Sequence, residues 1–191
     1  MEKKIFVLAL ISVSIMAGCG NESKLKDNDS QVSEQPLKKS KKETDELVSY
    51  TGLKIGDTVA VKYSKGYGGK YAFDFTLNKV EFTDQSLNGE APAYESGFVI
   101  FNVTIKNTGK DFLEIGSLDN SNYGSILSYG KDYGFKGLDA DEEIQTGESM
   151  TGEMVARYGK KGNQLTWGLE GVTTTFSYDI KADEIGDYVP E

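Results

Sequence analysis

The sequence has no histidine and only one cysteine, one tryptophan and three prolines in 191 residues. Without histidine, the chain lacks the side chain that most often acts as a general base near neutral pH and that most often binds metals. A single cysteine excludes an internal disulfide and a cysteine–histidine zinc site. We therefore expect no cofactor and no metal, and we expect the folded part to be stabilised by its apolar core alone.

Long apolar runs and an excess of positive charge are also missing. The apolar run at residues 5–15 is shorter than the roughly 20 residues that a membrane-spanning helix needs. The chain has 30 acidic against 21 basic residues, for a formal net charge of −9. An acidic protein is repelled by the phosphates of nucleic acids and of anionic lipids. The sequence therefore predicts no nucleic-acid partner.

The chain begins with the three parts of a secretory signal. Charged residues precede the apolar run, and Ala17 and Gly18 follow it directly before Cys19. This pattern resembles the bacterial lipoprotein signal peptide, although that family prefers Leu where this chain has Met16. The resemblance implies a signal peptide over residues 1–18, acyl chains such as palmitate on Cys19, and lipid anchoring at the extracytoplasmic face of the cell membrane. The alternative is an ordinary secretory signal that leaves Cys19 as a free thiol.

Residues 19–50 have the composition of a tether. They are rich in Lys, Glu, Asp, Ser, Asn and Gln and contain few large apolar residues. Such a segment cannot bury enough apolar surface to offset the entropy lost on ordering. The sequence therefore predicts a disordered tether that holds the next domain off the lipid surface. The basic run at residues 38–42 could contact the membrane face or a wall polymer, and a solvated linker is the simpler interpretation.

Residues 51–180 form the expected folded domain, and an acidic tail of little structure follows over residues 181–191. Short runs alternate apolar and polar residues between turns rich in Gly, Asn, Asp and Ser, a pattern typical of antiparallel β-sandwiches and barrels. The expected strands are residues 58–63, 73–82, 97–106, 112–115, 125–129, 133–136, 149–157, 164–169 and 173–180. The pattern therefore predicts an all-β domain.

Three of these strands make more specific predictions. The apolar positions of residues 73–82 change parity, which predicts a β-bulge near Asn78. Both faces of residues 97–106 are apolar, which predicts a central strand. Trp167 alternates with apolar neighbours in its strand, so we expect it in the core between two sheets.

Four segments carry a resemblance to a known family. They are residues 55–59 (Ile-Gly-Asp-Thr-Val), the strand at 75–82, the strand at 98–106 with the Asn-Thr-Gly that follows at 107–109, and residues 147–152 (Gly-Glu-Ser-Met-Thr-Gly). They resemble the DUF4352 family of bacterial extracytoplasmic domains, which is similar to telokin-like domains and mycobacterial secreted antigens. The family's apolar-proline ending is replaced after Gly152. The resemblance implies an antiparallel immunoglobulin-like β-sandwich and a non-catalytic surface domain, with no functional residues to transfer.

Tyrosine precedes glycine five times in or beside the expected loops. Tyrosine offers rigid amphipathic contact area and glycine offers an adaptable backbone, a mixture found in antibody-type binding loops. The alternative is that the glycines make turns and the rings cover core edges. The candidate binding residues are Tyr67, Tyr123, Tyr129, Tyr133 and Tyr158.

No group of residues in the sequence has the spacing of a catalytic or metal site. The glycine-rich residues 66–70 lack the phosphate-loop spacing, and the acidic residues 139–143 lack the pattern of a calcium loop. We therefore expect a membrane-anchored, non-enzymatic binding or accessory module with an unknown protein or wall-polymer partner. The alternatives are a carboxylate-based enzyme acting on cell-wall polymer, which needs two facing acids, and a purely structural surface domain.

Overall fold

A computed structural model describes residues 47–65, 69–92 and 96–189. The chain divides into the units Met1–Lys42 and Glu43–Glu191, and all described residues belong to the second. The signal peptide, Cys19 and Tyr67 lie outside the described residues, as does nearly all of the expected tether.

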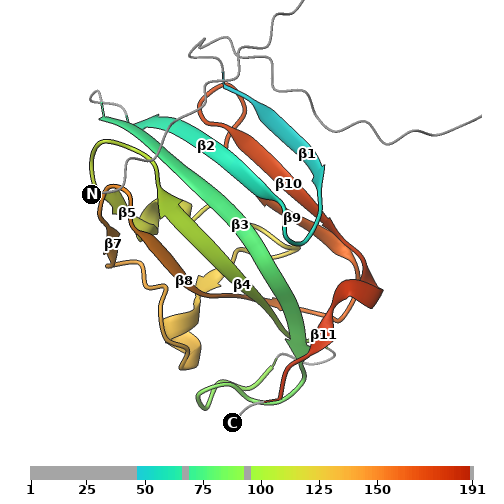
Figure 1. The fold of residues 1–191 in the computed structure, drawn as a ribbon. Helices are drawn as coiled ribbons and strands as arrows, with labels where there is room; N and C mark the ends of the chain where they lie inside the picture. Colours follow the sequence, from blue (N-terminus) through green and yellow to red (C-terminus); the bar gives the residue numbers. More distant parts are fainter. Residues whose placement is uncertain (1–46, 66–68, 93–95, 190–191) are drawn as a thin grey trace, which may run out of the picture. The chain divides into compact units, whose positions relative to one another are not determined.

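The described unit is built from β-strands, which confirms the all-β prediction (Figure 1). The largest sheet has the order β11-β3-β4-β8-β6, with β2 also paired to β3; a second sheet has the order β1-β10-β9, and β5 pairs with β7. The strands are β1 (Ser49–Leu53), β2 (Thr58–Lys65), β3 (Gly69–Thr83), β4 (Gly97–Asn107), β5 (Leu113–Glu114), β6 (Ser128–Tyr129), β7 (Glu143–Ile144), β8 (Ser149–Tyr158), β9 (Asn163–Trp167), β10 (Thr175–Ile180) and β11 (Gly186–Asp187). Three short 3-10 turns accompany them, η1 (Ile115–Leu118), η2 (Gly130–Tyr133) and η3 (Ala182–Glu184).

The core lies between the six-stranded and the three-stranded sheets. Phe75 on β3 packs against Phe176 on β10 with ring centroids 4.9 Å apart, and Phe73 packs edge-on against Trp167 at 5.6 Å. Trp167 is only 4% exposed, which confirms its expected place in the core. The alternating inward residues of β2, β3, β4, β9 and β10 therefore form one apolar layer, as a sandwich requires.

A β-bulge interrupts β3 where the parity change predicted it. The register with β4 shifts between Leu77 and Lys79, so Asn78 has no opposite residue. As a result, Leu77 and Val80 both face the core while Asn78 and Lys79 are exposed. The strand predicted to be central, β4, does lie between β3 and β8. The bulge thus places one additional polar side chain on the outer face of the large sheet.

The structure differs from the sequence-based expectation in its pairing and at its ends. Two pairs, β1 with β10 and β11 with β3, are parallel in an otherwise antiparallel fold. Strand β1 starts at Ser49, inside the range expected to be tether, because the edge of β10 pairs with it. The expected acidic tail contains β11, and Ile185 beside it is buried against the main core.

Two expected strand assignments were wrong. Residues 133–136 are not a strand, because the chain there leaves the turn η2 through Gly134, which has a φ of +85°. Strand β9 ends at Trp167, and Leu169 is 63% exposed because Gly168, with a φ of +100°, turns the chain away from the sheet.

The Asn-Thr-Gly segment after β4 is a turn built by a buried side chain. The Asn107 amide donates hydrogen bonds of 2.8 Å to the carbonyls of Asp111 and Ile144, and its oxygen accepts one of 2.8 Å from the Gly109 N–H. Gly109 does not have a positive φ, so the turn does not depend on the conformational freedom of this glycine. The most specific segment of the family resemblance is therefore explained by a structural role of Asn107.

Candidate functional site

The tyrosine-glycine pairs do not form a binding surface. Tyr123, Tyr129 and Tyr133 are 0%, 8% and 7% exposed, and Tyr158 is half-buried with its ring edge-on to Tyr123. Three exposed tyrosines at one end of the sandwich would have been needed, and the four described ones do not supply them. The prediction of tyrosine binding loops is therefore contradicted for these four residues, while Tyr67 lies outside the described residues.

The hydroxyls of Tyr123 and Tyr129 find backbone acceptors inside the fold, which lets both rings be buried. The Tyr123 hydroxyl donates to the carbonyl of Lys161 at 2.8 Å, and the Tyr129 hydroxyl donates to the Ile115 carbonyl at 2.8 Å and to Asp119 at 2.7 Å. Burial, and secondarily the Tyr158 hydroxyl, raises the pKa of Tyr123 from 10.0 to about 12. Burial, followed by the hydrogen bond to Asp119, raises the pKa of Tyr129 further. The rings are structural members of the core.

A different candidate site lies on the outer face of the six-stranded sheet. At one end of β4 and β8 this face is apolar, with Phe98, Ile100 and Val155 covered by Leu87 and Tyr133 in a small second core. Further along the same strands the outward positions become polar, with Asn102, Thr104, Thr151 and Glu153 in sequence positions that alternate with the main core. A groove lies where the apolar cover ends.

Two loop segments, residues 84–92 and 130–138, cover the apolar half of this face. Arg157 on β8 ties them together: its Nη2 forms an ion pair of 2.8 Å with Glu90, and its Nε donates to the Tyr133 hydroxyl at 3.2 Å. Its guanidinium also lies over the rings of Phe98 and Tyr133, at 5.6 and 5.9 Å from their centroids. Tyr133 therefore lines the groove and, through its contacts with Arg157, helps to hold the covering loops in place.

The groove has a volume of about 700 Å³ and draws its lining from segments far apart in the sequence. It lies between the sheet, the two covering loops and the end of the chain near β11. Polar surface predominates in it. The lining residues used below are Asn88, Asn102, Phe135, Lys136, Glu153 and Tyr188.

The floor of the groove is a preordered set of polar side chains. The Asn102 amide donates a hydrogen bond of 2.9 Å to the Glu153 carboxylate, and the Asn102 oxygen accepts one of 2.9 Å from Asn78 at the bulge. Beside them, the hydroxyls of Thr104 and Thr151 are 2.8 Å apart across β4 and β8. Within the described part of the chain no lysine or arginine forms an ion pair with Glu153. One carboxylate oxygen thus remains available to a ligand.

An aromatic pair forms one wall of the groove. Phe135 and Tyr188 are half-buried, and their rings meet edge-to-face with centroids 5.5 Å apart and an angle of 64°. Sequence reasoning missed both residues, because Phe135 was assigned to a strand and Tyr188 to an unstructured tail. The parallel pairing of β11 with β3 places Tyr188 here, and its backbone N–H donates to the Phe82 carbonyl at 2.8 Å.

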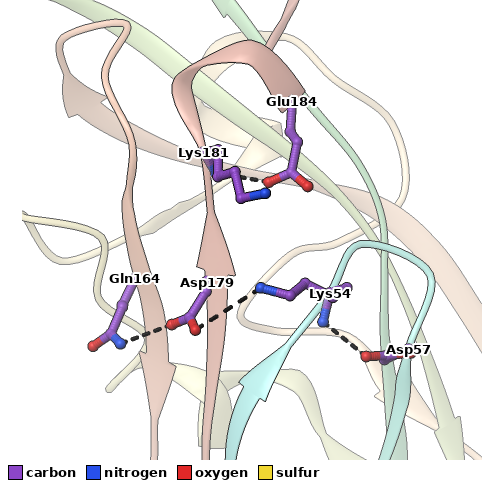
Figure 2. Close-up of polar contacts among 6 residues, drawn as sticks. All are labelled: Lys54, Asp57, Gln164, Asp179, Lys181 and Glu184. Atoms are coloured by element: carbon purple, nitrogen blue, oxygen red, sulfur yellow. Dashed lines mark hydrogen bonds and ion pairs between the residues drawn. The ribbon is translucent and has the colours of Figure 1, made fainter. Parts of the chain in front are cut away.

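A second polar cluster lies on the outer side of the three-stranded sheet (Figure 2). Asp179 on β10 accepts a hydrogen bond of 2.8 Å from Gln164 on β9 and lies 3.9 Å from the ammonium of Lys54, which follows β1. Asp57 accepts a 2.7 Å hydrogen bond from the Lys54 backbone N–H. These groups are largely exposed and satisfied by one another, so their role is to join the three strands rather than to bind a ligand.

The acidic residues 139–143 also form local contacts. Asp139 accepts a hydrogen bond from the Lys131 ammonium, which lowers the pKa of Asp139 and raises that of Lys131. Among the described residues, no three His, Cys, Asp or Glu side chains converge as a metal site would require. Within the same described ranges, no helix has the length and apolar character needed to cross a membrane.

Comparison with protein-family models found no match, and comparison with curated proteins found none. Among solved structures, the chain is similar to an uncharacterized β-sandwich protein from Clostridium difficile 630, with 16% identity over 74% of this chain and 100% of that one and a TM-score of 0.42. It is also similar to ycdA of Bacillus subtilis strain 168, described as a "putative lipoprotein", with 23% identity over 56% of this chain and 36% of that one and a TM-score of 0.40. These distant similarities carry no argument about the site.

Proposed function

We propose that this chain is a lipid-anchored extracytoplasmic lipoprotein whose β-sandwich is a non-catalytic binding module of the DUF4352 type. The groove on the outer face of the six-stranded sheet is its ligand site. The observation that carries this proposal is the preordered floor, in which Asn78 orients Asn102 and Asn102 orients Glu153 before any ligand is present. Groups fixed in this way lose little side-chain entropy on binding.

A binding role fits the groove better than catalysis does. Glycoside hydrolysis uses two carboxyl groups that flank the scissile bond. Of the described side chains that line the groove, Glu153 is the only carboxylate. Incubation with cell-wall polymer should therefore release no soluble fragments. Fragments released by the parent protein and not by Glu153→Gln would favour the carboxylate-based enzyme instead.

Anchoring is tested at Cys19. The thioether that joins a lipid to a lipoprotein requires sulfur, and Cys19 lies outside the unit that contains the β-sandwich. Cys19→Ser should therefore move the protein from the detergent phase to the aqueous phase and leave the melting temperature of the domain unchanged. If the variant still partitions into detergent, the anchor lies elsewhere.

Binding is tested with the lipid-free Cys19→Ser chain and isolated cell envelopes. We expect the chain to cosediment with envelopes and the double variant Asn102→Ala/Glu153→Ala to lose this retention. The matched control is Gln164→Ala/Asp179→Ala on the three-stranded sheet, which removes a similar hydrogen-bonded pair away from the groove. Equal retention of the groove and control variants would contradict the groove as the ligand site.

A further inference from the structure

We infer that the ligand of the groove is an uncharged glycan, a chain of sugar rings without carboxylate or phosphate groups. This inference rests on the proposed function of the groove. The groove volume is about 700 Å³, and sites for small molecules span roughly 300–1,000 Å³. The space therefore suits a short segment of a sugar chain lying across the sheet.

The aromatic wall matches the apolar faces of sugar rings. A pyranose ring exposes a face of C–H groups, which packs well on an aromatic ring and loses water there. Phe135 and Tyr188 hold each other edge-to-face at 5.5 Å and are packed from behind by the second core. Because these rings are already fixed, they offer contact area at a low cost in conformational entropy.

The polar floor matches sugar hydroxyls, which donate and accept at the same atom. The free oxygen of Glu153 accepts from one hydroxyl, and the second N–H of the Asn102 amide donates to the next. Hydrogen bonds to a carboxylate are stronger than those between neutral groups, so Glu153 fixes the orientation of the bound ring. Lys136 and Asn88 line the same groove and add donors at its edge.

Charge and backbone pairing disfavour the other common occupants. Lys136 and Glu153 both line the groove and balance each other in charge, and the formal net charge of −9 disfavours an anionic polymer. A peptide that binds by strand addition would need a free strand edge. At the floor, β4 is paired on both sides, and Gly130 packs so closely on Glu153 that a Cβ there would lie 2.6 Å from its carbonyl oxygen. The described strands of the floor therefore offer no edge to a peptide.

Calorimetric titration of the lipid-free Cys19→Ser chain tests this inference. The probes are N-acetylglucosamine and glucose tetrasaccharides, neutral polysaccharide released from envelopes, and polyphosphate. We expect binding to at least one uncharged glycan and none to polyphosphate. Glu153→Gln and Tyr188→Ala should each weaken glycan binding about tenfold, which corresponds to the loss of about one strong contact.

Matched controls separate a lost contact from a lost fold. Glu143→Gln and Phe112→Ala change an exposed carboxylate and an exposed ring that do not line the groove, and they should leave affinity unchanged. Tyr188→Ala removes part of the second core, so Glu153→Gln decides the test if the alanine variant fails to fold. Glu153→Gln removes the negative charge and leaves the shape of the side chain intact.

Three outcomes would contradict the inference that the ligand is an uncharged glycan. They are a failure of every uncharged probe to bind, binding of polyphosphate by the parent chain, or glycan binding that the groove variants leave unchanged. The envelope test separates this failure from a failure of the groove itself. If envelope retention still depends on Asn102 and Glu153, the groove binds a ligand of another class. If it does not, both proposals fall together.

Discussion

A Cβ added to Gly152 on β8 would lie 2.6 Å from the backbone nitrogen of the core residue Leu138, so the chain at Leu138 is in close contact with this strand. Gly137 makes the matching approach from the loop side: its φ is +105°, and a Cβ there would lie 2.6 Å from the Thr151 carbonyl oxygen. Close backbone contact at these two glycines holds residues 137–138 against β8, directly after the segment that carries Phe135.

We therefore predict that Gly152→Ala lifts this loop, destabilises the domain by about 1–3 kcal/mol and weakens ligand binding. The matched control is Gly159→Ala, where the added Cβ meets no atom within 4 Å and no positive φ opposes it. Urea denaturation followed by circular dichroism measures both changes. Equal stability of the two variants would show that the loop does not depend on this approach.

We predict that Asn107→Ala destabilises the domain by about 1–3 kcal/mol, because it removes the donor of a buried hydrogen bond to the Ile144 carbonyl and of a partly buried one to the Asp111 carbonyl. The Asn102→Ala variant is the control, since Asn102 is half-buried on the outer face and water can replace its lost partner. Thermal unfolding compares the two. A loss in Asn102→Ala as large as in Asn107→Ala would contradict the structural role assigned to the Asn-Thr-Gly segment.

Trp167→Ala should destabilise the domain by about 3–5 kcal/mol, because a large ring between the two sheets leaves a cavity when removed. Leu169→Ala, two residues further along and exposed, should change stability by less than about 0.5 kcal/mol. Circular dichroism in urea measures both, since the alanine variant has no tryptophan signal. A small loss at Trp167 would mean that the ring does not fill the core.

Buried tyrosines predict a loss of stability at alkaline pH. In the unfolded chain these hydroxyls ionise near pH 10.0, whereas in the folded chain the pKa of Tyr123 is about 12 and burial also raises the pKa values of Tyr129 and Tyr178. A raised folded pKa contributes stability that is complete below the unfolded pKa and is lost as the pH rises through the folded pKa. Unfolding free energy should therefore fall above pH 10.0, with Tyr123 contributing up to about pH 12.

Tyrosinate absorbance at 295 nm, recorded during a pH titration, checks this prediction. The folded chain should show a set of tyrosines that ionises only as the domain unfolds. The variant Tyr123→Phe should reduce the amplitude of that set. A single transition for all tyrosines near pH 10.0 in the folded protein would contradict their burial.

Local patterns in the sequence predicted the features that depend on neighbouring residues. The parity change in β3 revealed the bulge at Asn78, and alternation placed Trp167 in the core. The tyrosine-glycine pairs misled because composition does not reveal whether a ring finds a backbone acceptor inside the fold, as Tyr129 does. That outcome depends on contacts between distant segments.

The groove could be predicted only in part, because its parts meet through tertiary packing. One signal was present: along residues 97–106 the outward positions change from Phe98 and Ile100 to Asn102 and Thr104. This change marks where an apolar cover ends on the outer face of a central strand. The return of Tyr188 to that face depends on the parallel β11–β3 pair, which no local pattern in the acidic tail indicates.

Hydrogen–deuterium exchange of the lipid-free chain, with and without neutral polysaccharide released from envelopes, tests the central claim most directly because it locates a ligand without altering a residue of the groove. The account predicts that the glycan slows exchange in residues 84–92, 130–138 and 186–189 around the groove, with the three-stranded sheet unchanged. Slower exchange confined to β1, β9 and β10, or no change anywhere in the described domain under saturating glycan, would contradict it.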